Sequence, residues 1–176
     1  MTAPAGKFVW GMVLLSLAAT VWAQRRPDPL TPLEGDQLRD AAQEPALRIK
    51  LYVGFARARL VALEQMRADP KVTDRGQQTH DKLQNFLEVY DELNDNLDTF
   101  VGRRADLRKP AKLVIEADTE FQAKLRALES SADASPAEVE QYRFLLGNVL
   151  EAVDGGLQDH KQLLAEQEEA AKRKKK

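Results

Sequence analysis

Apolar residues recur at spacings of three and four from Pro45 almost to the end of the chain, which is the pattern of amphipathic helices. Val, Ile and Thr never form the alternating run that a half-buried strand needs. The sequence therefore predicts an all-α protein. The apolar stripes of its four main segments are Ile49, Tyr52, Ala56, Leu63 and Met66; Leu83, Phe86, Tyr90, Leu93, Leu97 and Phe100; Ala111, Val114, Phe121, Leu125 and Leu128; and Val139, Tyr142, Leu146, Val149 and Val153.

Three local signals mark helix boundaries. Thr31-Pro32-Leu33-Glu34 and Ser135-Pro136-Ala137-Glu138 each combine a capping hydroxyl, a first-turn proline and a glutamate three residues after the cap. The first signal predicts a short leading helix that ends near Gln43. Pro70 ends the first long stripe, because proline cannot continue a helix.

The segment from Gly102 to Pro110 leaves two interpretations open. A shift of 65 residues lays Pro45-Ala46 on Pro110-Ala111, and a shift of 63 lays Leu83 to Asp91 on Leu146 to Asp154. This internal repeat favours an antiparallel four-helix bundle made from a duplicated α-hairpin, residues 45–102 and 107–170, with Asp106 as the cap of the second hairpin.

The alternative has three helices, with a long central helix kinked at Pro110. It rests on the three-four phase, which continues from Leu83 to Leu128 and fails only at Arg104 and Asp118. Such unbroken phase is also typical of a coiled coil.

The first 23 residues have the order of a secretory signal peptide. Lys7 precedes an apolar run, and Val21-Trp22-Ala23 is a small-x-small cleavage site. We therefore expect export to the periplasm or the exterior after cleavage near Ala23, with a membrane anchor formed by an uncleaved signal as the alternative. Residues 24–31 are expected to form a linker, 32–170 the helical domain and 171–176 a basic disordered tail.

Composition excludes several classes of protein. With 26 basic and 28 acidic residues the chain lacks the positive field of a nucleic-acid binder. It contains no cysteine, which excludes disulfides, zinc thiolates and iron–sulfur ligation. Positions 24–171 carry 20 basic and 28 acidic residues, and the last five residues are all basic. The body is acidic and the tail is basic.

No motif indicates an enzyme or a cofactor. The serines of the exported portion all lie in the turn 130–135, and neither His80 nor His160 belongs to a Glu-x-x-His pair. His160 falls on the apolar seam, where we expect it beside Arg103 or Arg104 as a polar residue at the bundle edge. His80 is expected to be solvated.

Three features are candidate binding sites. An acidic ladder could collect divalent cations, although a solvated face is its ordinary interpretation. Gly155-Gly156 indicates either a close helix contact or a ligand gap. The basic tail could contact an anionic surface. The ladder comprises Glu88, Asp91, Glu92, Asp95 and Asp98, and the tail contacts are Lys172, Lys174, Lys175 and Lys176.

These features together predict an exported, non-catalytic helical bundle with an interaction or scaffold role in the cell envelope. Its partner is expected to be a protein or an envelope component rather than a nucleic acid. The alternative is a helical bundle that binds a small ligand or a divalent cation. The sequence does not define the oligomeric state.

Overall fold

The computed structural model describes residues 28–173, which form five α-helices and no strand. The all-α prediction is confirmed. The count is five rather than the four of the predicted bundle, because the leading helix is a separate element. The helices are α1 (Pro32–Asp40), α2 (Pro45–Ala68), α3 (Arg75–Gly102), α4 (Arg108–Glu129) and α5 (Pro136–Arg173).

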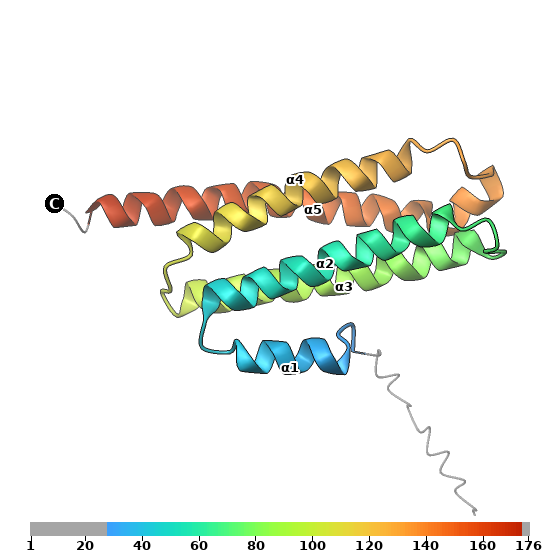
Figure 1. Cartoon of the computed structure of the whole chain (residues 1–176). Coiled ribbons are helices and arrows are strands. Elements are labelled where there is room, and N and C mark those ends of the chain that lie inside the picture. The colour runs from blue at the N-terminus through green and yellow to red at the C-terminus, as the bar shows by residue number, and fades with distance from the viewer. Residues whose placement is uncertain (1–27, 174–176) are drawn as a thin grey trace, which may run out of the picture.

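The four long helices form two antiparallel hairpins, α2–α3 and α4–α5, which lie side by side (Figure 1). Between the hairpins, α2 packs on α4 and α3 packs on α5, each pair running in the same direction. α1 packs only on α2. α5 begins beyond the end of α4, so its first turns lie against the turn that joins α2 to α3 (Figure 1).

The apolar stripes meet in one core. Every predicted stripe residue is buried except Met66, Leu128 and Val139, which are partly buried against the core. Three aromatic rings lie at its centre: Phe86 stacks on Tyr90 with centroids 5.8 Å apart, and Phe121 meets Phe86 edge-on at 5.4 Å. Edge-on and offset pairs of this kind stabilise a core beyond the area that they bury.

The predicted caps form, with one difference. Thr31 and Glu34 make a complete capping box, in which each side chain accepts from the other's backbone amide. Ser135 accepts from the Glu138 amide, but the Glu138 carboxylate turns instead to Arg67 and Arg75. Glu138 therefore joins α5 to the other hairpin rather than completing its own cap.

The helical structure is interrupted between α3 and α4, so the alternative with one long helix kinked at Pro110 is wrong. Ala105 N–H donates to Phe100 C=O and Arg104 N–H donates to Val101 C=O, the two bonds of a Schellman motif. Arg104 occupies its left-handed position, with φ of 57°. Helix α3 ends there although the residue is not the usual glycine.

α4 begins at Arg108, which makes Pro110 its third residue, where a missing amide proton breaks no helical bond. The predicted cap at Asp106 is wrong by one residue. Leu107 is the cap position, and the Asp106 carboxylate accepts instead from the Arg108 backbone amide. The origin of the two hairpins in a duplication stays a prediction.

α5 continues to Arg173, three residues past the expected domain boundary at 170, so Lys172 lies on its last turn. The expected signal peptide, its cleavage site and residues 24–27 of the linker lie outside the described residues, as do Lys174, Lys175 and Lys176. Among the helices of residues 28–173, none combines the length and the apolar character that crossing a membrane requires.

Candidate functional site

Three polar side chains form a buried network between α3, α4 and α5. Tyr90 Oη donates to Asp118 Oδ1 at 3.0 Å, and His160 Nδ1 lies 2.7 Å from Asp118 Oδ2. Tyr90 and Asp118 are fully buried and His160 is 5% exposed. Because an ionised carboxylate can only accept, Asp118 assigns the proton to Nδ1 of His160. The carboxylate thus fixes the orientation of both partner side chains.

The Tyr90 hydroxyl lies in a low-polarity environment. Burial, with the neighbouring Asp118 carboxylate, raises the pKa of Tyr90 far above its ordinary value, so this phenol stays protonated and keeps its donor role. Removing one member of such a network leaves another buried polar group unpaired, which is costly. The network therefore fixes how α3, α4 and α5 align.

Gly156 leaves space for this network. A β-carbon at Gly156 would overlap the Tyr90 hydroxyl and lie 3.2 Å from its Cζ. A β-carbon at Gly155 or Gly147 would meet nothing within 4 Å. Gly156 thus makes the close helix contact that was one of the two expectations, whereas Gly155 borders open space.

That open space is a groove of about 510 Å³ along α3 and α5. Gly155 and Gly156 line it, together with the ring of His160, so the buried network forms part of its floor. Its polar lining is otherwise acidic or amide in character. The polar residues that line the groove are Asn94, Asp98, Glu151, Asp159, His160, Gln162 and Glu166.

The acidic ladder is not assembled into a metal site. Asp91, Asp95 and Asp98 are exposed on α3, and Glu88 and Glu92 are half-buried. Partial loss of hydration at the Asp91 carboxylate, together with the charges of Asp95 and Glu88, raises its pKa. Within residues 28–173 no three carboxylate or imidazole groups are placed to hold a metal ion. Of the ladder, Asp98 alone lines the groove.

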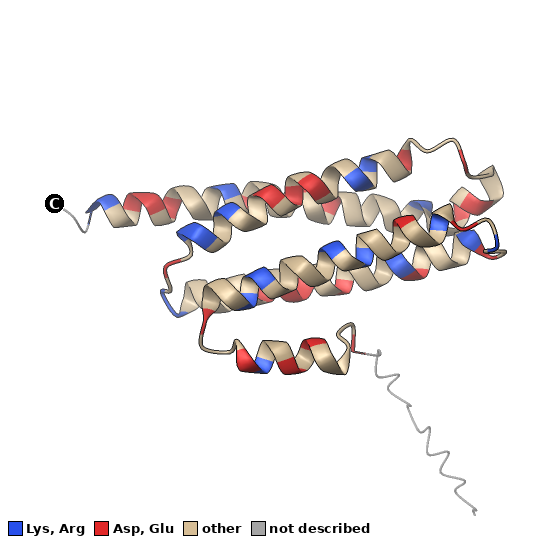
Figure 2. Ribbon diagram, in the orientation of Figure 1, with Lys and Arg blue, Asp and Glu red and all other residues tan. Residues whose placement is uncertain are grey.

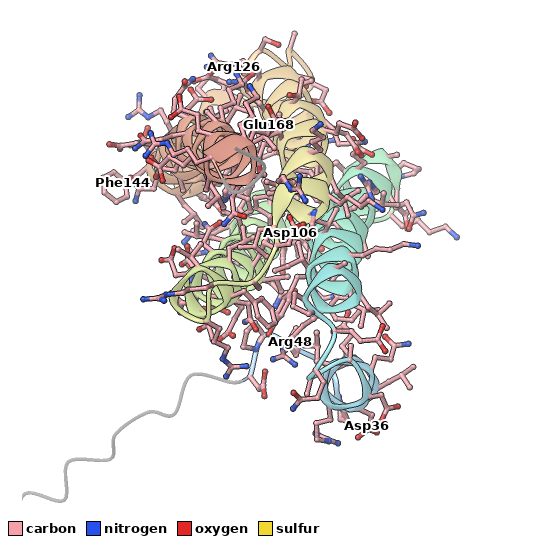
Figure 3. The ribbon with its side chains drawn as sticks, turned by 90° about the vertical axis from the view of Figure 1, so that its left-hand side faces the viewer. Asp36, Arg48, Asp106, Arg126, Phe144 and Glu168 are labelled. Atoms are coloured by element: carbon pink, nitrogen blue, oxygen red, sulfur yellow. The ribbon has the colours of Figure 1, made fainter. Side chains whose placement is uncertain are left out.

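A second charged region of the molecule is basic rather than acidic. The α3–α4 loop, the start of α4 and the last turn of α5 come together and form the basic end of the bundle (Figure 2). Figure 3 views the molecule from this side and shows Asp106 and Glu168 there. The basic end comprises Arg103, Arg104, Arg108, Lys109, Lys112, Lys172 and Arg173.

Three carboxylates partly neutralise the basic end. Arg108 pairs with Asp106 at 2.5 Å, Lys112 with Glu168 at 3.3 Å and Arg173 with Glu169 at 3.2 Å. Arg103, Arg104, Lys109 and Lys172 are exposed and pair with no carboxylate among the described residues. An excess of positive charge remains at this end.

The serines of the turn 130–135 and His80 contact only residues close to them in sequence. Ser130 donates to the Arg126 carbonyl, Ser131 bonds Asp133, and Ser135 caps α5. The His80 side chain is 40% exposed and lies 3.5 Å from Asp81. These contacts stabilise turns and helix ends.

Sequence reasoning missed Asp118 and misplaced His160. Asp118 was visible as an interruption of the apolar stripe, and a carboxylate at a core position is itself a signal of a buried partner. His160 does not lie beside Arg103 or Arg104. α5 starts well beyond the end of α4, so the register places His160 opposite Asp118.

Comparisons with known proteins add no relative. The chain matches no protein-family model, no curated protein and no solved structure. The functional argument therefore rests on the residues themselves.

Proposed function

We propose that the chain is an exported, non-catalytic helical bundle that acts by contact in the cell envelope, and that its basic end binds an anionic envelope component. Export rests on the sequence pattern of residues 1–23. The two hairpins repeat a sequence pattern, which supports their origin in a duplicated α-hairpin. The function follows from the surface rather than from a reactive group.

The observation that carries this proposal is the clustering of cations at the basic end. Arg103 and Arg104 come from the α3–α4 loop, Lys109 from α4 and Lys172 from α5. The fold brings these three segments together, while the rest of the bundle is acidic overall. Each cation near an anionic surface contributes about 1 kcal/mol, so four together can support measurable binding.

The sequence predicts that this charge continues beyond the described residues. Lys174, Lys175 and Lys176 follow directly on Arg173. The predicted tail therefore follows directly on the last turn of α5, which is one of the three segments of the basic end. An anionic lipid surface or an anionic envelope polymer would meet both.

The test compares two triple variants with the same net charge. Arg103→Gln, Lys109→Gln and Lys172→Gln remove cations from the basic end; Lys71→Gln, Arg126→Gln and Arg143→Gln remove three from other exposed positions. Binding to vesicles that contain anionic lipid is measured by co-sedimentation at several salt concentrations. The first variant should lose binding, and the loss should shrink as salt screens the charges.

Circular dichroism and thermal unfolding of both variants check that the fold is retained. Equal loss of binding in the two variants would show that overall charge, and not the basic end, is responsible. Wild-type protein that binds neither anionic vesicles nor anionic envelope polymers at low salt would refute the proposed contact.

A further inference from the structure

The most exposed large apolar side chain of the described residues is Phe144, on the solvent face of α5. It is 82% exposed, and Figure 3 shows its ring pointing away from the bundle. Covering an aromatic ring removes about 150–250 Å² of surface from water, which is a strong driving force for association. One exposed ring does not define an interface. The rest of the same helix face supplies what the ring would contact.

Gly155 lies on the same face of α5 as Phe144. The two residues are eleven positions apart, which is about three helical turns and about 16 Å. Gly155 is exposed, and a β-carbon there would meet nothing within 4 Å. It borders the groove between α3 and α5, where Ala152 and the 40% exposed Val101 add accessible apolar surface. The face therefore carries a projecting ring and, three turns away, an open depression with an apolar lining.

The charges beside the ring and beside the depression are complementary. Arg143 precedes Phe144 and is exposed, and within residues 28–173 its ion-pair partner is Glu140 of the same helix turn. Four carboxylates and no lysine or arginine of the described chain line the groove, and one of them, Asp159, lies one turn beyond Gly155. Opposite charges on two surfaces favour their association and fix their orientation. A second molecule that carries an arginine next to an aromatic ring would match the groove in both respects.

We infer that α5 forms a dimer interface in which the Phe144 ring of each copy lies over Gly155 of the other. Because ring and groove share one helix face, two antiparallel α5 helices related by a two-fold axis make both contacts at once, and the assembly closes as a dimer. The axis lies midway between Phe144 and Gly155, near residues 149 and 150. It brings Asn148 opposite Glu151 of the second copy, so that an amide donor faces a carboxylate on each side of the axis.

This interface is small. Each copy contributes a few turns of one helix and one aromatic ring, so the total buried area falls at or below the roughly 1,200 Å² that separates transient from stable interfaces. We therefore expect a dimer that dissociates in the micromolar range. The inference does not depend on the proposed function, because the basic end takes no part in it.

Sedimentation equilibrium of the full chain between about 1 and about 500 µM measures the dimer directly. Phe144→Ser should weaken dimerisation at least about tenfold, whereas Leu33→Ser, which changes the exposed apolar residue of α1, should change it less than about twofold. Gly155→Leu fills the depression and should also weaken the dimer, whereas Gly54→Leu, at an equally open glycine of α2, should not. Circular dichroism checks that each variant is folded.

Charge exchange tests the antiparallel arrangement. Arg143 lies beside Asp159 of the second copy, whereas within one copy the two residues are sixteen positions, or about 24 Å, apart along α5. Arg143→Glu and Asp159→Lys should each weaken dimerisation at least about fivefold, and the two changes together should restore it to within about threefold of the wild type. Only contact between copies can produce that restoration. Glu140→Gln should strengthen the dimer, since Glu140 also faces Asp159 of the second copy.

A wild-type chain that stays monomeric up to about 500 µM would overturn the inference. Equal effects of Phe144→Ser and Leu33→Ser would also overturn it, as would a charge-exchanged double variant that dimerises no better than the weaker single variant. Loss of vesicle binding in Phe144→Ser, without a change in sedimentation, would assign the ring to a lipid surface instead of a second copy. Vesicle binding that is retained in Phe144→Ser keeps this test separate from that of the basic end.

Discussion

Replacing Gly156 by alanine should destabilise the protein, although the same change at its neighbour should stabilise it. In the middle of a helix, alanine is favoured over glycine by about 1 kcal/mol. Gly155 and Gly147 have open space around the added β-carbon, so Gly155→Ala and Gly147→Ala should each increase the free energy of unfolding by about 0.5–1 kcal/mol.

At Gly156 the added carbon would overlap the Tyr90 hydroxyl and approach Tyr90 Cζ to 3.2 Å. The ring is packed against Phe86 and Phe121, so it cannot move freely. Overpacking costs about 1–3 kcal/mol, and loss of the hydrogen bond to buried Asp118 costs about as much again. After the helical gain of about 1 kcal/mol is subtracted, we expect a net loss of about 1–5 kcal/mol.

Urea unfolding of the three alanine variants and the wild type gives these differences, provided that the denaturant slope is unchanged. Tyr90→Phe supplies the internal control, since it removes the overlapping oxygen and the hydrogen bond in advance. In that background Gly156→Ala should cost at least about 1 kcal/mol less than in the wild type. If Gly156→Ala instead stabilises the protein as Gly155→Ala does, the close contact between α3 and α5 described above is refuted.

Three further predictions concern charges and the backbone. A hydrogen bond from Arg75 lowers the pKa of Glu138 below its ordinary value of 4.5, so this contribution to stability is present above that pH and lost on acidification; Glu138→Gln should therefore flatten the fall of Tm at acid pH. Burial raises the pKa of all three tyrosines above 10.0, so tyrosinate absorbance at pH 10 should be below half-maximal in the folded protein and close to half-maximal in denaturant. Half-maximal absorbance in the folded state would contradict this. Arg104→Gly removes a left-handed non-glycine residue and should raise the free energy of unfolding by up to about 1 kcal/mol, whereas Arg104→Ala should leave it nearly unchanged.

The elements that the sequence predicted correctly depend on neighbours along the chain. Thr31 and Ser135 cap their helices because a hydroxyl reaches amides only two or three residues away. Pro70 follows the end of α2 for an equally local reason. The apolar stripes predicted the core because a three-four spacing places residues on one helix face whatever that face meets.

The elements that were missed depend on contacts between distant segments. The end of α3 has an arginine where a Schellman motif usually has glycine, so no composition signal marks the break, and Asp118 was treated as a flaw in an apolar phase. The His160 partner depends on helix register. A tight hairpin would place His160 opposite residues near 104, but α5 extends past α4 by several turns, which moves its partner about four turns along α4 to Asp118.

The glycine pair in α5 explains why the two hairpins differ in chemistry despite their repeated pattern. The 63-residue shift aligns Gly155-Gly156 with Glu92-Leu93, so the first hairpin has side chains at the two positions where the second has none. Tyr90 belongs to the first hairpin, and its hydroxyl lies against Gly156 of the second. It completes a network whose other members, Asp118 and His160, belong to the second hairpin. The same pair of glycines thus allows a polar contact across the core on one side and an acidic groove on the other. A side chain at Gly156 would overlap the Tyr90 hydroxyl and one at Gly155 would enter the groove, so the network and the groove each depend on one of these two glycines.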